Sequence, residues 1–144
     1  MATIEKLDDL GDLLVNQTVP MKARYRALFT LKNIGGKDAI KNISKGFQDP
    51  SSLLKHECAY CLGQMQDPSA IDTLIKVLKN TSEDPMVRHE AGEALGAIGV
   101  NSSNVLNVLN DYAKDSHPEV AETCQCKIKT NIEIKNDLRK KIIF

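Results

Sequence analysis

Hydrophobic residues recur along this chain at the spacing of amphipathic helices. After Asp67-Pro68 the apolar positions stand at i, i+3, i+4 and i+7: Ile71, Leu74, Ile75 and Leu78. After Asp84-Pro85 a second single stripe follows: Val87, Ala91, Ala94, Leu95 and Ile98. No stretch of useful length alternates between apolar and polar residues as a half-buried strand does. The pattern therefore predicts an all-α fold.

The same stripe recurs at intervals of about 31–33 residues, which is the mark of a repeat protein. The other copies are Ala23, Ala27, Thr30, Leu31 and Ile34; Leu54, Cys58, Cys61, Leu62 and Met65; and Val120, Cys124 and Ile128. We expect an α-solenoid of about four helix pairs that resemble HEAT repeats, together forming a half-domain over residues 1–130. The repeats are expected at roughly 1–36, 37–66, 67–99 and 100–130. The remainder, 131–144, is expected as a charged tail or the start of a linker.

Pairs of a helix-capping residue and proline predict where helices begin. They are Asp49-Pro50, Asp67-Pro68, Asp84-Pro85 and His117-Pro118. An aspartate before a helix accepts hydrogen bonds from its first free N–H groups, and proline at the first helical position loses no bond. We expect three or four of these pairs to start helices, with His117 as a turn residue.

One position in the second helix of each pair, the inner slot, carries the candidate chemistry. In chain order it holds Tyr25-Arg26, His56-Glu57, His89-Glu90 and Glu122-Thr123, so that His-Glu occurs twice, 33 residues apart. His89 lies about 200° around the helix from the buried Val87, and therefore points away from the core stripe. In a solenoid the second helices line up, so both His-Glu pairs are expected on one concave surface.

Small residues accompany each histidine on the same side of its helix. Gly92 and Gly96 follow His89, and Ala59 and Gly63 occupy the matching positions after His56. Because glycine costs a helix interior about 1 kcal/mol relative to alanine, their presence suggests that something approaches this face closely. We expect the small residues to form a bed beside each histidine, opposite the core.

Two histidines with one or two carboxylates suit a non-haem iron site, and zinc fits the same ligand types. Two such half-sites facing each other would hold two irons and activate O₂. The plainer interpretation is a set of solvated polar residues on the surface of a non-enzymatic, HEAT-like scaffold that binds a protein. Two copies in register, each with its glycine seven residues later, favour the metal site over that alternative.

Composition narrows the function classes further. The 144 residues include 19 Lys and Arg and 19 Asp and Glu, so no net charge draws the chain to nucleic acid or membranes. No stretch approaches the roughly 20 apolar residues of a membrane helix, and the first residues do not resemble a secretory signal. A cytoplasmic location is expected, where the four cysteines stay reduced. The Cys58-x-x-Cys61 spacing suggests zinc or redox chemistry, but both residues fall on the buried stripe. We therefore expect small core thiols.

Four segments of the chain resemble deoxyhypusine hydroxylase, a HEAT-repeat di-iron monooxygenase. The specific ones are LKHECAYCLGQMQD and PMVRHEAGEALGAIG, supported by ARYRALFTLKNIGG and EVAETCQ. The resemblance runs from about residue 21 to 127. Bilin-lyase-like repeats share the helical framework but not the full His-Glu arrangement.

The resemblance implies an iron- and O₂-dependent hydroxylation of deoxyhypusine on the translation factor that carries hypusine. It implies His56 and His89 as ligands of one iron and Glu57 as a ligand of the second. Glu90 would bind metal or, better by family analogy, hold the substrate amine. Enzymes of this family use four His-Glu pairs, whereas this chain has two and so matches the N-terminal half. It is then a half-domain of a longer chain, a half that pairs with itself, or a degenerate half without activity.

Overall fold

The computed structural model describes residues 3–99 and 101–143 as a stack of helix pairs, without strands in that part of the chain. The pairs are α1 (Ile4–Val15) with α2 (Met21–Ile34), α3 (Gly36–Ser44) with α4 (Ser52–Met65), α5 (Ile71–Lys79) with α6 (Pro85–Ile98), and α7 (Ser103–Tyr112) with α8 (Pro118–Ile142). Two short 3₁₀ turns, η1 (Lys45–Gln48) and η2 (Pro68–Ala70), lie between them. The expected all-α solenoid is confirmed.

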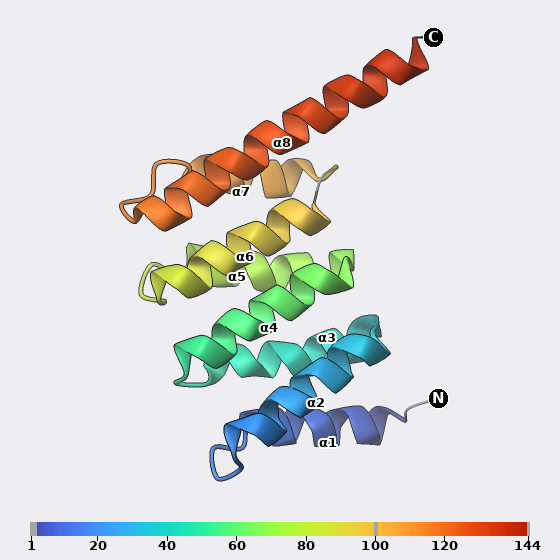
Figure 1. Cartoon of the computed structure of the whole chain (residues 1–144), viewed down its shortest axis with the longest axis vertical. Helices are drawn as coiled ribbons and strands as arrows, with labels where there is room; N and C mark the ends of the chain where they lie inside the picture. The colour runs from blue at the N-terminus through green and yellow to red at the C-terminus, as the bar shows by residue number, and fades with distance from the viewer. Residues whose placement is uncertain (1–2, 100, 144) are drawn as a thin grey trace.

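The two helices of each pair form two layers. Figure 1 shows α2, α4, α6 and α8 stacked as one layer, with α1, α3, α5 and α7 behind them, and the two termini at opposite ends of the stack. The core runs continuously between the layers. Its fully buried members include Leu14, Leu28, Leu31, Ile43, Leu54, Leu62, Leu74, Leu78, Leu95 and Leu109. Each repeat thus buries its apolar face against its neighbours.

Three of the four expected helix starts are found. Asp67 and Asp84 each accept a hydrogen bond from a backbone N–H two residues later, at 2.9 and 2.8 Å, and His117 precedes α8. The expectation for Asp49-Pro50 is wrong, because Ser51 caps α4 and accepts from Leu54 N–H at 3.2 Å. The carboxylate of Asp49 is buried, accepts from Ser51 N–H at 2.9 Å and pairs with Arg24.

The buried stripe of α2 differs by one position from the expected one. Arg24, Ala27, Leu28 and Leu31 are buried, whereas Thr30 and Ile34 are exposed. The sequence pattern misled because a buried arginine takes a core position that an apolar count does not recognise. Gly35, at φ 72°, ends the helix in a conformation that glycine adopts without strain.

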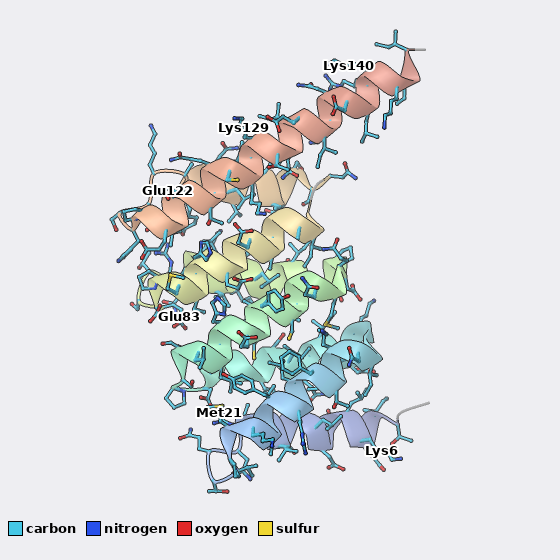
Figure 2. The ribbon with its side chains drawn as sticks, viewed as in Figure 1. Lys6, Met21, Glu83, Glu122, Lys129 and Lys140 are labelled. Atoms are coloured by element: carbon cyan, nitrogen blue, oxygen red, sulfur yellow. The ribbon has the colours of Figure 1, made fainter. Side chains whose placement is uncertain are left out.

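The last helix is longer than the others and continues well past α7 (Figure 1). Residues 131–142, expected as a tail or linker, are helical because the segment has no glycine or proline and ends in basic residues that suit a helix C-terminus. Figure 2 shows the side chains along α8, with Lys129 and Lys140 labelled. Within the residues described, no helix is both long and apolar enough to cross a membrane.

Candidate metal half-site

The two His-Glu pairs lie on neighbouring second helices and meet. His56 and Glu57 belong to α4, and His89 and Glu90 to α6. The imidazole Nε2 of His56 lies 3.2 Å from Oε2 of Glu90, so the first pair directly contacts the second. The His56 side chain is 29% exposed and that of Glu90 is 14% exposed, so both lie at the surface of the stack and outside the fully buried core.

The other nitrogen of His56 is left without a hydrogen bond. Its Nδ1 is buried and lies 3.5 Å from Oε1 of Glu57, which is too long for a good bond. A buried polar atom without a partner is uncommon and costs free energy. This atom therefore marks a place where a ligand or a small shift of the ring would supply the missing partner.

Glu90 is a partly buried carboxylate whose ionised form a nearby cation would stabilise. Its removal from water raises the pKa of Glu90, and the nearby His56 and His89 oppose that rise. Glu93 and Glu57 add to it because they place further negative charge nearby. A metal cation or a substrate ammonium group at this point would stabilise the ionised form of Glu90.

Glu57 borders a shallow hollow of about 290 Å³ beside α2, which it lines with Tyr25 and Phe29. The pKa of the Tyr25 phenol is raised, mainly by burial and then by the negative charge of Glu57. Tyr25 is the inner-slot residue of the first repeat, so that repeat also contributes to the surface around the His-Glu pairs.

His89 is held by the repeat that follows it. Its Nδ1 lies 2.6 Å from the hydroxyl oxygen of Thr123 and 3.2 Å from the backbone carbonyl oxygen of Glu119, both on α8. The sequence analysis assigned the fourth repeat no role at the site and missed these contacts. The repeat spacing was the available signal, because Thr123 follows His89 by 34 positions, as Glu90 follows His56.

The small residues beside the histidines have a different partner from the expected one. A methyl group on Gly63 would lie 3.1 Å from the Cα of Ala94, and one on Gly92 would lie 3.1 Å from a methyl of Thr123. The close approach is confirmed, but α6 and α8 make it and no ligand does. The expectation that these residues face away from the core is wrong, because stacked second helices bury them against one another.

A series of buried and partly buried ion pairs links each second helix to the loop before the next one, and the sequence analysis missed it. Arg24 pairs with Asp49, Lys55 with Glu83 at 2.5 Å, and Arg88 with Asp115 at 2.6 and 3.2 Å. Figure 2 labels Glu83 in the loop before α6. In each ion pair a basic residue directly before the inner slot reaches a carboxylate in the loop that leads to the next second helix. That recurrence was visible in the sequence.

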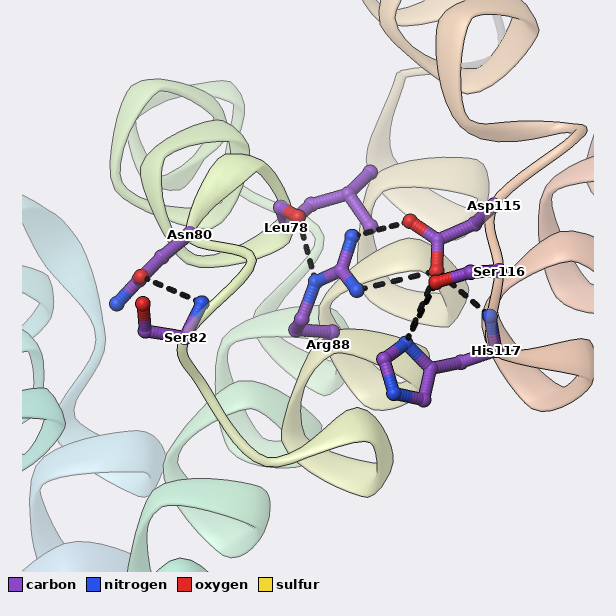
Figure 3. Close-up of polar contacts among 7 residues, drawn as sticks. All are labelled: Leu78, Asn80, Ser82, Arg88, Asp115, Ser116 and His117. Atoms are coloured by element: carbon purple, nitrogen blue, oxygen red, sulfur yellow. Dashed lines mark hydrogen bonds and ion pairs between the residues drawn. The ribbon is translucent and has the colours of Figure 1, made fainter.

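Arg88 shows how one of these ion pairs works (Figure 3). Its Nε donates to the carbonyl oxygen of Leu78 at 3.0 Å, and its two terminal nitrogens donate to both carboxylate oxygens of Asp115. Asp115 also accepts from the backbone N–H of His117 at 3.0 Å. Arg88, the residue next to His89 on α6, therefore joins α6 to the end of α5 and to the loop that leads to α8.

The remaining candidates have structural roles. Cys58, Cys61 and Cys124 are fully buried, as expected of core thiols, and burial raises the pKa of Cys61 to about 12 and that of Cys124 to about 11. His117 is confirmed as a turn residue. Glu93, one turn after His89, pairs with Lys127 at 2.7 Å.

The donor set fits a metal only in part. Among residues 3–99 and 101–143 no group of three or more His, Cys, Asp or Glu side chains is arranged to hold an ion. The buried, unpartnered nitrogen of His56 and the buried carboxylate of Glu90 nevertheless suit a cation. The chain therefore presents part of a donor set, and further ligands would have to come from outside it.

Comparison with known proteins gives the family. The family model for HEAT repeats matches residues 7–83 and 48–125. The chain belongs to the HEAT-repeat family. Among curated HEAT-repeat relatives, deoxyhypusine hydroxylase of Drosophila pseudoobscura pseudoobscura is 60% identical over 86% of this chain. The rat and human deoxyhypusine hydroxylases are 56% and 55% identical over 90% of it. The resemblance inferred from the sequence is confirmed.

A solved structure agrees with the fold. The structure of human deoxyhypusine hydroxylase in complex with glycerol superposes with a TM-score of 0.87 at 51% identity, over 93% of this chain and 46% of that one. The chain covers 40–42% of the curated relatives named above. It thus spans less than half the length of the proteins that it resembles.

Proposed function

We propose that this chain supplies one half of a deoxyhypusine hydroxylase. The observation that carries the proposal is the direct contact between two His-Glu pairs from adjacent repeats, His56 to Glu90 at 3.2 Å. It occurs in a chain 55–60% identical to curated enzymes of that name. The second half would come from another half-domain or from a second copy of the chain.

The proposed cofactor is iron, two ions in a complete site. The imidazoles of His56 and His89 would hold one ion. Glu57 of this chain would reach across to the second ion, whose histidines would come from the complementary half. When bound, iron supplies the redox chemistry needed to activate O₂, which these side chains lack. The reaction balances if O₂, two electrons from an external reductant and two protons give one hydroxyl on the substrate and one water.

Glu90 is proposed to bind either the metal or the substrate amine. A deoxyhypusine side chain carries ammonium groups, and one of them would satisfy a carboxylate that is 14% exposed. The hollow beside Tyr25 and Phe29 would receive apolar parts of such a chain. The proposed substrate is the translation factor that carries hypusine, and the proposed location is the cytoplasm.

The experiment compares hydroxylation with oligomeric state. The purified chain, loaded anaerobically with Fe(II), is assayed on a deoxyhypusine-containing peptide at several concentrations while light scattering gives its mass. Activity should follow the dimer or an added second half, and His56→Ala and His89→Ala should abolish it. His117→Ala, away from the site, should retain it. Full activity from a monomer, or from either site variant, would contradict the proposal.

A further inference from the structure

We propose that Thr123 is a positioning residue for His89, so that the fourth repeat orients a metal ligand of the third. Thr123 and the backbone carbonyl of Glu119 both contact Nδ1 of the His89 ring. Nε2 is thereby left as the nitrogen that would bind the metal. The role of His89 as a metal ligand rests on the proposed function, whereas the orientation of its ring by Thr123 does not.

The two partners of Nδ1 together assign the proton to that nitrogen. A carbonyl oxygen only accepts, so the Glu119 carbonyl, 3.2 Å from Nδ1, favours a protonated Nδ1. We assign the Thr123 hydroxyl, 2.6 Å from the same nitrogen, as the closer acceptor of that N–H. In a neutral imidazole one nitrogen is protonated and the other is not, so Nε2 keeps the lone pair that a metal needs. Metal-binding histidines commonly have their other ring nitrogen held in this way.

The repeat places a polar residue at the same point beside each histidine. The residue 34 positions after each histidine contacts its ring: Glu90 reaches Nε2 of His56, and Thr123 reaches Nδ1 of His89. The contact with Thr123 leaves Nε2 of His89 free of that partner.

The packing of α8 on α6 brings the hydroxyl within reach. Thr123 is 5% exposed, and a methyl group on Gly92 would lie only 3.1 Å from the Thr123 methyl. Gly92 therefore permits the close helix approach that the contact requires. This gives the glycine beside His89 a role in positioning the ring, although it does not contact a ligand.

The test reads the tautomer of His89 directly in the metal-free chain. Long-range ¹H–¹⁵N correlation NMR at alkaline pH distinguishes Nδ1–H from Nε2–H imidazole, and the His89 signal is the one missing in His89→Gln. Wild type should show Nδ1–H. Thr123→Val keeps the shape but loses the hydroxyl, so it should give a mixture of tautomers, whereas Thr123→Ser should keep the wild-type pattern.

Thr130→Val is the matched control, because Thr130 is an exposed residue of the same helix whose hydroxyl donates to the Cys126 carbonyl. It should leave the His89 spectrum unchanged. An Nε2–H tautomer in wild type, or an unchanged spectrum in Thr123→Val, would overturn the proposal. If Thr123→Val does not fold, the wild-type and Thr123→Ser spectra still decide.

Anaerobic Fe(II) titration of the same proteins separates this inference from the proposed function. Loss of the Thr123 contact should weaken iron binding about 10- to 100-fold. If no variant and not even the wild type binds iron while the Nδ1–H tautomer is present, the proposed function fails and the hold on the ring stands. If wild type binds iron with the Nε2–H tautomer, the role of Thr123 fails.

Discussion

At the scale of single residues, two kinds of polar side chain are buried for opposite reasons. Arg88 is 1% exposed and has its donors satisfied by Asp115 and the Leu78 carbonyl. His56 and Glu90 are half-buried, and Nδ1 of His56 lacks a hydrogen-bond partner. The first arrangement stabilises the stack, and the second is the basis of the proposed metal half-site.

Replacing Arg88 by methionine should destabilise the fold by about 3–5 kcal/mol, because Asp115 would stay buried without its partner. Urea denaturation followed by circular dichroism measures this. Lys45→Met is the control: Lys45 pairs with an Asp12 side chain that is 75% exposed, so its loss should cost less than about 1 kcal/mol. Equal effects of the two substitutions would refute the structural role of Arg88.

Asp115 should make stability depend on acid pH. The Arg88 hydrogen bonds lower the pKa of Asp115 from 3.8 to about 2. A lowered folded-state pKa contributes stability above the unfolded value, and that stability is lost as the pH falls from about 4 towards 2. The loss should be about 2 kcal/mol. Asp115→Asn should lack this part of the pH dependence, which unfolding measured between pH 5 and 2 will show.

The His-Glu pairs were accessible from sequence because the repeat aligns them and the helical angle turns them off the core stripe. The partners of His89 and Arg88 were missed, although the repeat spacing pointed to Thr123 and to the loop carboxylate Asp115. Glu119 contributes through its backbone, which no side-chain pattern reveals, and Asp115 lies 27 positions from Arg88 in a loop. Such contacts depend on the angle at which one helix pair stacks on the next.

At the scale of helices, small residues let the second helices approach one another. Gly63 on α4 faces the backbone of Ala94 on α6, and Gly96 faces Lys127 on α8. The sequence indicated a close approach at these positions. It did not indicate what approaches, because a glycine in a helix marks closeness without naming the partner.

Gly63→Ala should destabilise the protein although alanine is the better helix former by about 1 kcal/mol. The added methyl would lie 3.1 Å from a backbone atom and 3.0 Å from the methyl of Ala94, neither of which moves easily. A net loss of about 1–3 kcal/mol is expected in thermal unfolding. The neighbouring exposed Gln64→Ala should change stability by less than about 0.5 kcal/mol. A stabilised Gly63→Ala would show that the helices pack less closely.

At the scale of the whole molecule, the stack places the two repeats that carry His-Glu pairs between two others. The first repeat brings Tyr25 beside Glu57, and the last brings Thr123 to His89. The solenoid and its repeat number followed from periodicity alone, because each pair must bury its stripe on the next. The proposal of a half-site came from the resemblance, and the chain spans 40–42% of the relatives' length.

The most direct measurement is the iron content of the chain and its three histidine variants after anaerobic Fe(II) loading and removal of free metal. The account predicts about one iron per chain in wild type and in His117→Ala, and loss of that iron in both His56→Ala and His89→Ala. Iron content unchanged by either site substitution would contradict a shared half-site on α4 and α6, as would a wild-type chain that takes up no iron.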